Sequence, residues 1–186
     1  MKKQENQRIT LTKRLVQEAF LLLLKTTSIQ KMSVRDLCAK AGINRTTFYN
    51  HYSCPQDVLN EMSQNYLTDV EQTLNSVVIG NHEETHQRVE IVFHYMEEHL
   101  ELSRILINNN LDSSFIEKLF SLPKIIELLE ETLTKVENQY EKNAIISFAT
   151  SGSVKLIQDW INADNRISAK KEAYLVLKLS KRVCSV

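Results

Sequence analysis

One glycine in the first third of the chain, Gly42, divides the segment SVRDLCAKAGINRTTFYNHY (residues 33–52) into two short helices. Ser33 can cap the first helix, and Asp36, three residues later, completes a capping box. Gly42 can end that helix because glycine adopts positive φ at little cost. Asn44 is a favourable N-cap for the second helix. The spacing predicts a helix-turn-helix, a motif that lays its second helix in a DNA major groove.

Each helix of this motif is expected to have one apolar side. Val34, Leu37 and Cys38 fall at positions i, i+3 and i+4, so they form the inner face of the first helix. In the second helix Phe48 points inward, which leaves the other residues facing outward. The outward side chains are Arg45, Thr46, Thr47, Tyr49 and Asn50.

The motif and its flanks resemble the DNA-binding domain of the TetR/AcrR transcriptional regulators. The resemblance rests on residues 33–52, on LTKRLVQEAFLLLL before them and on DVL shortly after them, and it covers roughly the first third of the chain. It implies an all-α fold. An N-terminal three-helix helix-turn-helix domain, expected at residues 1–54, is joined through a long helix to a larger helical effector-binding and dimerisation domain, expected at residues 55–186.

Composition agrees with such a fold. Only three Gly and two Pro in 186 residues favour an all-helical protein. Residues 1–60 hold ten Lys/Arg and four Asp/Glu, whereas residues 61–186 hold thirteen and nineteen. A basic N-terminal third on an acidic remainder fits nucleic acid at one end, although chance clustering in a neutral protein produces the same balance.

Hydrophobic periodicity predicts the remaining helices. The first helix is expected to begin at Thr10 or Thr12. Its predicted inner face comprises Leu11, Leu15, Ala19 and Leu22. The long fourth helix has Pro55 in its first turn, where a missing N–H does little harm, and ends near Gly80. Later helices are predicted at residues 83–100, 102–109, 112–140 with an interruption at Pro123, 143–163 and 168–183.

Two residues of the second motif helix are suited to reading bases. The guanidinium fork of Arg45 matches the O6/N7 edge of guanine. Thr46 lies beside it and can touch either a base or a thymine methyl group. The plainer alternative is that Arg45 and Tyr49 simply cover a helix surface.

Other residues are expected to hold phosphates. By resemblance, Thr47, Tyr49 and His51 would contact phosphates on either side of the groove, fixing register without reading sequence. Ser33 and Arg35 could add contacts from the start of the preceding helix. The predicted DNA-binding residues are Ser33, Arg35, Asn44, Arg45, Thr46, Thr47, Tyr49, Asn50 and His51, with Lys13 adding non-specific attraction.

One departure from the family pattern concerns the first turn of the fourth helix. Many members carry a Lys there that contacts phosphate. This chain has Cys54, Pro55, Gln56 and Asp57 instead, with no cation. One expected phosphate contact is therefore missing or moved.

The C-terminal domain is expected to bind a small apolar effector and to form the dimer. Aromatic residues at helical spacing can line a pocket, although they are more often plain core. The predicted lining residues are Phe93, Tyr95, Phe115, Phe120 and Tyr140. The stretch FATSGSVKLIQDWI resembles a late helix of one branch of the family, in which the last two helices pair with their copies, although the following NADNRIS lacks the Gly common in relatives. The predicted interface residues are Gly152, Leu156, Trp160, Tyr174 and Leu177.

Metal, cofactor and catalytic chemistry have weak signals. His82 and His86 share a helix face beside Glu83, but no further ligand has suitable spacing, so an exposed pair is favoured over a metal site. Cys54 at a helix start could sense oxidants, but an ordinary thiol is favoured. No phosphate cradle or nucleophile motif exists, and we expect no enzyme, metal or cofactor.

Cysteine usage bears on the compartment. The three cysteines Cys38, Cys54 and Cys184 are odd in number and lack C-x-x-C spacing, which favours a reducing cytoplasm. The polar residues 1–8 resemble no signal peptide, and the apolar run 21–24 is too short to span a bilayer.

The sequence therefore predicts a cytoplasmic homodimeric regulator that binds a near-palindromic operator, most simply a repressor released by a small molecule. The alternative is a ligand-independent regulator or co-activator controlled by a protein partner. A second alternative is an all-helical enzyme with a substrate cavity, in which only His94 is placed to titrate.

Overall fold

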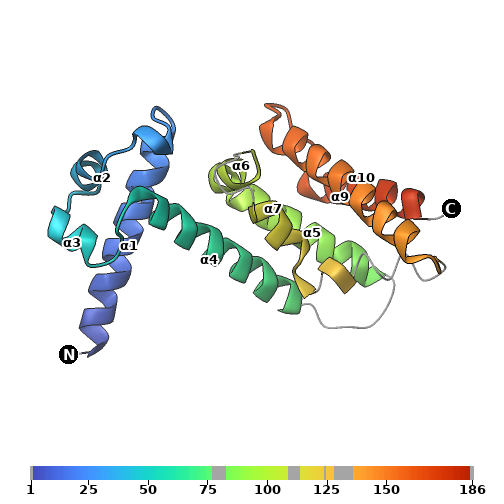
Figure 1. The fold of residues 1–186 in the computed structure, drawn as a ribbon, viewed down its shortest axis with the longest axis horizontal. Helices are drawn as coiled ribbons and strands as arrows, with labels where there is room; N and C mark the ends of the chain where they lie inside the picture. Colours follow the sequence, from blue (N-terminus) through green and yellow to red (C-terminus); the bar gives the residue numbers. More distant parts are fainter. Residues whose placement is uncertain (1, 77–82, 109–113, 124, 128–135, 185–186) are drawn as a thin grey trace. The chain divides into compact units, whose positions relative to one another are not determined.

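The computed structural model describes residues 2–76, 83–108, 114–123, 125–127 and 136–184. All regular structure in these ranges is helical, which confirms the predicted all-α class. The chain divides into two compact units (Figure 1). Unit 1 spans residues 1–66 and unit 2 spans residues 67–186, so the fourth helix contributes residues to both.

Unit 1 contains the helix-turn-helix, and its first helix runs from Lys2 without a break. The elements in chain order are α1 (Lys2–Leu24), the 3-10 helix η1 (Ile29–Lys31), α2 (Val34–Ala41), α3 (Arg45–Tyr49) and α4 (Pro55–Ser76). The prediction that α1 begins at Thr10 or Thr12 is wrong. The preceding Lys, Gln and Glu residues are good helix formers, so the helix extends backwards without needing a cap.

The core of unit 1 is built from a narrower face of α1 than predicted. Val16, Ala19 and Phe20 are buried at i, i+3 and i+4. Leu11 and Leu22 are each 49% exposed, so the predicted inner face was wrong at both of these positions. Apolar residues occur on several sides of this helix, and only packing against α2 and α3 selects among them. Leu37 of α2 and Phe48 of α3 are fully buried.

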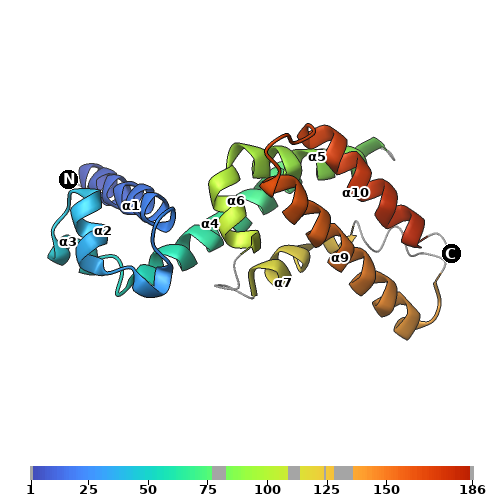
Figure 2. The ribbon, with the colours of Figure 1, turned by 90° about the horizontal axis from the view of Figure 1, so that it is seen from above.

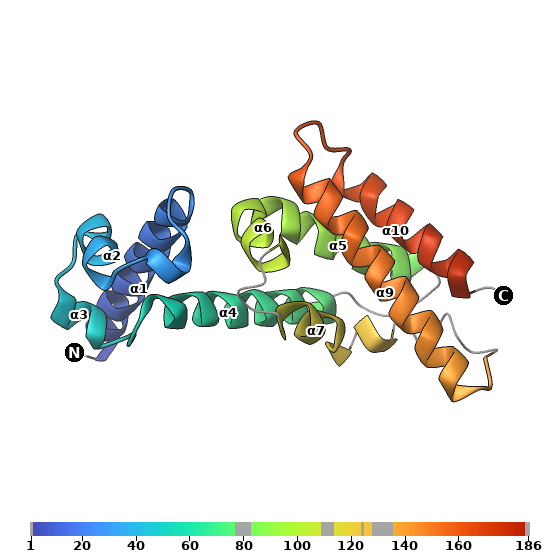
Figure 3. The same ribbon diagram turned by 45° about the horizontal axis from the view of Figure 1, so that its top comes forward.

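Unit 2 is a bundle of helices in which α5, α9 and α10 form the main packed group. Its described helices are α5 (Glu83–Glu98), α6 (Leu100–Asn108), α7 (Ser114–Phe120), α9 (Gln139–Asn162) and α10 (Ala169–Cys184). α10 lies beside both α5 and α9, and α6 packs on α9 (Figure 2). α7 runs alongside the C-terminal half of α4 (Figure 3), where Leu74 and Leu119 are buried.

The C-terminal end of α9 is tied to two neighbouring segments. Trp160 Nε1 donates to the carbonyl of Ile167 in the turn before α10, at 2.8 Å. Arg104 Nε of α6 donates to the carbonyl of Ile161 at 2.7 Å. These bonds satisfy groups at a helix end that would otherwise lack partners.

Two predicted helix limits near α9 need correction. Asn138 caps α9, because its side-chain oxygen accepts from the N–H groups of Tyr140 and Glu141. The preceding helix therefore does not continue to Tyr140, which belongs to the first turn of α9, and α9 begins at Gln139 instead of the predicted residue 143. Residues 128–135 lie outside the described part of the chain.

Candidate functional site

The turn between α2 and α3 is fixed by local hydrogen bonds, as predicted. Ser33 Oγ accepts from the N–H of Asp36 at 3.1 Å and donates to Asp36 Oδ2 at 2.6 Å. The bond from Ser33 lowers the pKa of the Asp36 carboxyl below its usual range, and Arg35 lowers it further. Gly42 has φ 67° and ψ 30°, and a Cβ there would meet no atom within 4 Å. Backbone conformation, not space, therefore selects glycine.

α3 is held by two of its residues and presents the others. Asn44 Oδ1 accepts from the N–H of Thr47 at 2.7 Å, which caps the helix. Phe48 is fully buried, and its ring packs against Tyr52 with centroids 5.6 Å apart. Tyr49 is 58% exposed, and Arg45 is exposed at the first helical position. The side chains that this helix offers to a partner are therefore separate from those that anchor it.

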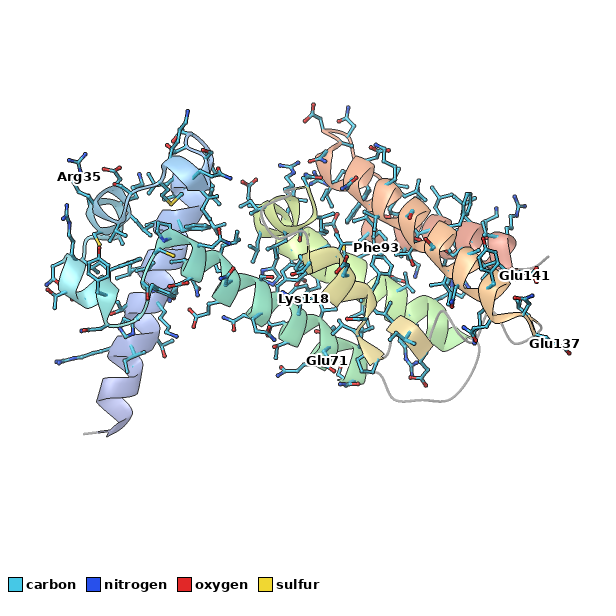
Figure 4. All side chains as sticks on the ribbon, viewed as in Figure 1. Arg35, Glu71, Phe93, Lys118, Glu137 and Glu141 are labelled. Carbon is cyan, nitrogen blue, oxygen red and sulfur yellow. The ribbon has the colours of Figure 1, made fainter. Side chains whose placement is uncertain are left out.

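The structure brings most of the predicted DNA-binding residues onto exposed surface of unit 1. Arg45, Thr46, Tyr49 and Asn50 are exposed, whereas Thr47 and His51 are half-buried. The side chain of Arg35 is 76% exposed and projects from α2 (Figure 4), with Nε 3.4 Å from Asp36 Oδ1. The side-chain oxygens of Asn44 and Ser33 cap the two motif helices. The contacts with DNA predicted for these residues would therefore use their backbone N–H groups, or would require their side chains to leave the caps.

Lys13 has a structural partner that the sequence did not indicate. Its ammonium group forms an ion pair with Glu61 of α4 and lies 5.9 Å from the ring centroid of Tyr52. The Tyr52 hydroxyl donates to Glu61 Oε2, and Gln17 Nε2 donates to the same oxygen at 3.4 Å. Glu61 balances the charge of Lys13, and the non-specific attraction to DNA expected of Lys13 stays a prediction.

The charges of this cluster shift two pKa values. Burial raises the pKa of Glu61, but the hydrogen bonds from Lys13 and Tyr52 outweigh burial and place it below its usual value. Burial raises the pKa of Tyr52 far above its usual value, and the Glu61 carboxylate raises it further. Glu61 was missed in the sequence because its partners are 48 and 9 positions away. Its one available signal was an acidic residue beside the buried Leu59 and Met62.

The start of α4 is occupied by the helix's own carboxylate. Asp57 Oδ2 accepts from the N–H of Ser53 at 2.8 Å and from the N–H of Cys54 at 3.3 Å. A helix N-terminus attracts anions through such groups. The segment in which the family pattern has a phosphate-binding Lys therefore carries an acidic group that takes two backbone donors.

Unit 2 contains a partly open apolar cavity of about 110 Å³. Its described lining residues come from α4, α5, α7, α9 and α10 and from the short helical segment that follows α7. They are Leu74, Val89, Val92, Phe93, Met96, Leu119, Phe120, Ile125, Ser153, Ile157, Val176, Leu177 and Ser180. A mostly apolar cavity with a few polar groups is the usual form of a small-molecule site.

The predicted effector-pocket residues divide between the cavity and other places. Phe93 and Phe120 line the cavity, and Figure 4 marks Phe93 among the helices of unit 2. Phe115 is fully buried but is not a lining residue, and the Tyr95 hydroxyl donates to Asp69 Oδ2 at 2.9 Å. Tyr140 is 84% exposed, which argues against a lining role because its ring lies in solvent.

A second hollow lies between α9 and α10 on the outside of unit 2. This groove has a volume of about 460 Å³, and its walls include Phe148, Leu156 and Leu179. Phe148 is 69% exposed and Leu179 is 39% exposed. Exposed apolar side chains gathered on one face indicate an interaction surface.

The predicted interface residues do not all lie on this groove. Gly152 and Leu156 line it, and Tyr174 is 54% exposed on α10. Trp160 and Leu177 are buried within the unit itself, at 4% and 7% exposure. A Cβ at Gly152 would meet no atom within 4 Å, so no helix in the described part of the chain approaches it closely.

Metal and thiol chemistry gain no support among the described residues. His82 lies outside the described part of the chain, and the ring of His86 stacks on Tyr174 with centroids 5.9 Å apart. No described group of three His, Cys, Asp or Glu side chains is placed to hold a metal ion. His94 lies between Glu90 and Glu97 on the surface of α5 and does not line the cavity. Cys54 is half-buried.

No helix in the described ranges is long and apolar enough to cross a membrane.

The comparison with protein-family models gives a match within the second unit. The TetR_C_8 family model, described as a transcriptional regulator C-terminal region, matches residues 83–182, which is more than half of the chain. Comparison with curated protein sequences gives no match.

Solved structures share the fold over nearly the whole chain. A TetR transcriptional regulator from Streptococcus agalactiae 2603V is similar with a TM-score of 0.74 and 19% identity, covering 97% of this chain and 99% of that one. A TetR-family regulator from Syntrophomonas wolfei str. Goettingen has a TM-score of 0.72 and 15% identity, covering 94% and 95%. The dihydroxyacetone kinase operon activator DhaS has a TM-score of 0.59 and 18% identity, covering 91% and 93%.

The fold and the motif together define a class of all-helical proteins in which a small helix-turn-helix unit precedes a larger helical unit. The match over residues 83–182 narrows this class. The chain belongs to the TetR family of transcriptional regulators, as the resemblance of residues 33–52 predicted.

Proposed function

We propose that this chain is a cytoplasmic, sequence-specific DNA-binding regulator that acts as a homodimer on a near-palindromic operator. The observation that carries the proposal is the construction of α3, which is anchored by Asn44 and Phe48 and leaves Arg45, Thr46 and Tyr49 exposed. Arg45 reads a guanine, and Tyr49 and Thr47 contact phosphates on either side of it.

The groove between α9 and α10 supports the homodimer. Phe148, Leu156 and Leu179 expose apolar surface there, and a second copy of the same two helices would cover it. Two-fold symmetry places two copies of α3 on two half-sites, separated by about 34–36 Å or a multiple of one helical turn. An operator with two similar half-sites follows from that symmetry.

The cavity in unit 2 supports control by a small molecule. A ligand shifts an equilibrium between two conformations only when it prefers one of them. Filling the apolar cavity would favour an arrangement of the two subunits whose α3 helices no longer match the operator. Repression then follows from bound protein blocking transcription, and relief follows from ligand binding.

A second candidate is activation of transcription through a protein partner. DhaS, whose fold this chain shares, is an operon activator, so the fold by itself is compatible with either sign of regulation. A purified chain that binds its operator without slowing transcription, and that retains a protein partner in pull-down, would favour this candidate.

The test of DNA binding is fluorescence anisotropy on the DNA upstream of the chain's own gene, beside a scrambled duplex and at several salt concentrations. We expect a specific complex with two subunits per site and a steep salt dependence. Arg45→Ala should cost about 1–3 kcal/mol on the operator and much less on scrambled DNA. Lys31→Ala, which removes one exposed positive charge from η1, is the matched control.

Two results would count against the proposal. Equal losses on both duplexes for Arg45→Ala would remove the base-reading role of that residue. No binding to either duplex at low salt would remove the proposed function.

A further inference from the structure

The described lining of the cavity in unit 2 is apolar apart from two hydroxyl groups. Among the lining residues that the structure describes, only Ser153 of α9 and Ser180 of α10 carry side-chain oxygen or nitrogen, and none of these described residues carries a charge. Burying an unpaired charge against these side chains is very costly, so they favour a neutral ligand.

The hydroxyl protons of both serines already take part in hydrogen bonds within the protein. Ser153 Oγ lies 2.7 Å from the carbonyl oxygen of Ala149, and a carbonyl can only accept, so Ser153 donates to it. Ser153 Oγ also lies 3.3 Å from Ser180 Oγ. Because Ser153 has used its one proton, Ser180 is the donor of that second bond. The pair then offers the cavity oxygen lone pairs but no proton.

The size of the cavity limits the ligand further. An engineered apolar cavity of about 150 Å³ binds benzene. The cavity here is about 110 Å³, so it suits a compact molecule with on the order of six to eight non-hydrogen atoms.

We propose that the cavity selects compact neutral molecules with an apolar body and one hydrogen-bond donor, the class of phenols and small alcohols. The donor bonds to the oxygen lone pairs of Ser180 and Ser153, and the apolar body contacts Phe93, Met96 and Ile157. The regulatory meaning of this binding rests on the function proposed above, but the binding itself does not depend on DNA.

The chain contains one reporter for this site. Trp160 is its single tryptophan, and its ring centroid lies 5.3 Å from that of the cavity-lining Phe93. Ligand entry beside Phe93 should change Trp160 fluorescence. The full-length chain can therefore be titrated directly with phenol, with toluene as the same shape without a donor, and with benzoate as a charged analogue.

The decisive comparison is between the unaltered chain and Ser180→Ala. Phenol affinity should fall about fivefold or more in Ser180→Ala, because the phenol hydroxyl loses the Ser180 oxygen and keeps only Ser153 as an acceptor, whereas toluene affinity should be unchanged or tighter. Ser151→Ala removes an exposed hydroxyl from α9 and should change neither affinity. Circular dichroism of each variant establishes that it is folded.

Three outcomes would overturn the proposal: no saturable effect of phenol on the unaltered chain, equal losses of phenol and toluene affinity in Ser180→Ala, or benzoate binding as tightly as phenol. The anisotropy assay separates this inference from the proposed function. Phenol binding without operator binding would refute the DNA-binding role alone, and operator binding without phenol binding would refute the ligand class alone.

Discussion

Removing the Tyr52 hydroxyl should weaken unit 1 through the carboxylate of Glu61. Tyr52 is 5% exposed, and its hydroxyl donates to that carboxylate. A hydrogen bond to a charged acceptor contributes about 1.5–3 kcal/mol. After Tyr52→Phe, Glu61 still has Lys13 and Gln17 as donors. We therefore expect Tyr52→Phe to lower the free energy of local unfolding of unit 1 by about 1.5 kcal/mol, which is the lower end of this range.

Glu61→Gln tests the other half of the same contact. The amide oxygen can still accept from Tyr52, but the negative charge facing Lys13 is lost. The side chains of Lys13 and Glu61 are 35% and 26% exposed, so this ion pair is neither fully exposed nor fully buried. Its loss should therefore lower the stability of unit 1 by about 1–2 kcal/mol. Because Tyr52 and Glu61 are the two partners of one hydrogen bond, the double variant should lose about 1 kcal/mol less stability than the sum of the two single losses.

Hydrogen exchange of the full-length chain, resolved by segment, is the assay for both variants. Exchange should speed up in α1, in α3 and at the start of α4, while α9 and α10 remain unchanged. Tyr49→Phe is the control, since it removes an exposed tyrosine hydroxyl at the end of α3. Unchanged exchange in α3, or strictly additive losses in the double variant, would refute the coupling between Tyr52 and Glu61.

The same cluster predicts how stability depends on pH. The folded-state pKa of Glu61 is below its usual 4.5, so its contribution is complete above that pH and is lost as the pH falls through the folded value. The folded-state pKa of Tyr52 is above its usual 10.0, so its contribution is lost only as the pH rises past that range. The stability difference between the unaltered chain and Glu61→Gln should therefore shrink on acidification below about pH 4.5 and stay constant near neutrality.

Three further predictions concern the turn, the cap and the dimer. Gly42→Ala should destabilise unit 1 by about 1–2 kcal/mol in urea unfolding, because alanine must adopt positive φ although its Cβ has space; a neutral effect would contradict this. Asn44→Ala should lower the opening free energy of α3 by about 1 kcal/mol in hydrogen exchange, and no change would mean that the cap contributes nothing. Leu156→Glu should shift the chain towards monomer in sedimentation, whereas an unchanged mass would exclude the α9–α10 groove as the interface.

Local signals account for what the sequence predicted correctly. Ser33, Gly42 and Asn44 each act within three or four residues of themselves, so the caps and the turn of the motif could be placed from spacing alone. Phe48 was placed inward as the apolar residue of the second motif helix, and it is fully buried.

Long-range contacts account for what the sequence did not predict. The role of Lys13 depends on Glu61, 48 positions away, and no local pattern links them. Trp160 looked suited to an interface, but its indole N–H bonds to Ile167 and its ring packs on Phe93 within the same unit. Tyr140 looked suited to a pocket, but the Asn138 cap places it in the first turn of α9 with its ring exposed.

The division of the chain follows from the same long-range contacts. The predicted limit of the DNA-binding domain at residue 54 stays a prediction about function. The compact unit that contains the motif extends to Tyr66, and Glu61, which lies beyond residue 54, binds both Lys13 and Tyr52. A fragment intended to retain the motif in its folded form therefore needs the first half of α4.

The separation between anchoring and exposed residues in α3 has a consequence for how such a regulator can diverge. Asn44 and Phe48 maintain the helix, and neither is placed to discriminate between bases. Arg45, Thr46 and Tyr49 are exposed and contribute little to the core, so substitutions there are close to neutral for stability. Under the proposed function, one copy of a duplicated gene can acquire a new target site through the base-reading positions Arg45 and Thr46 while its fold is preserved.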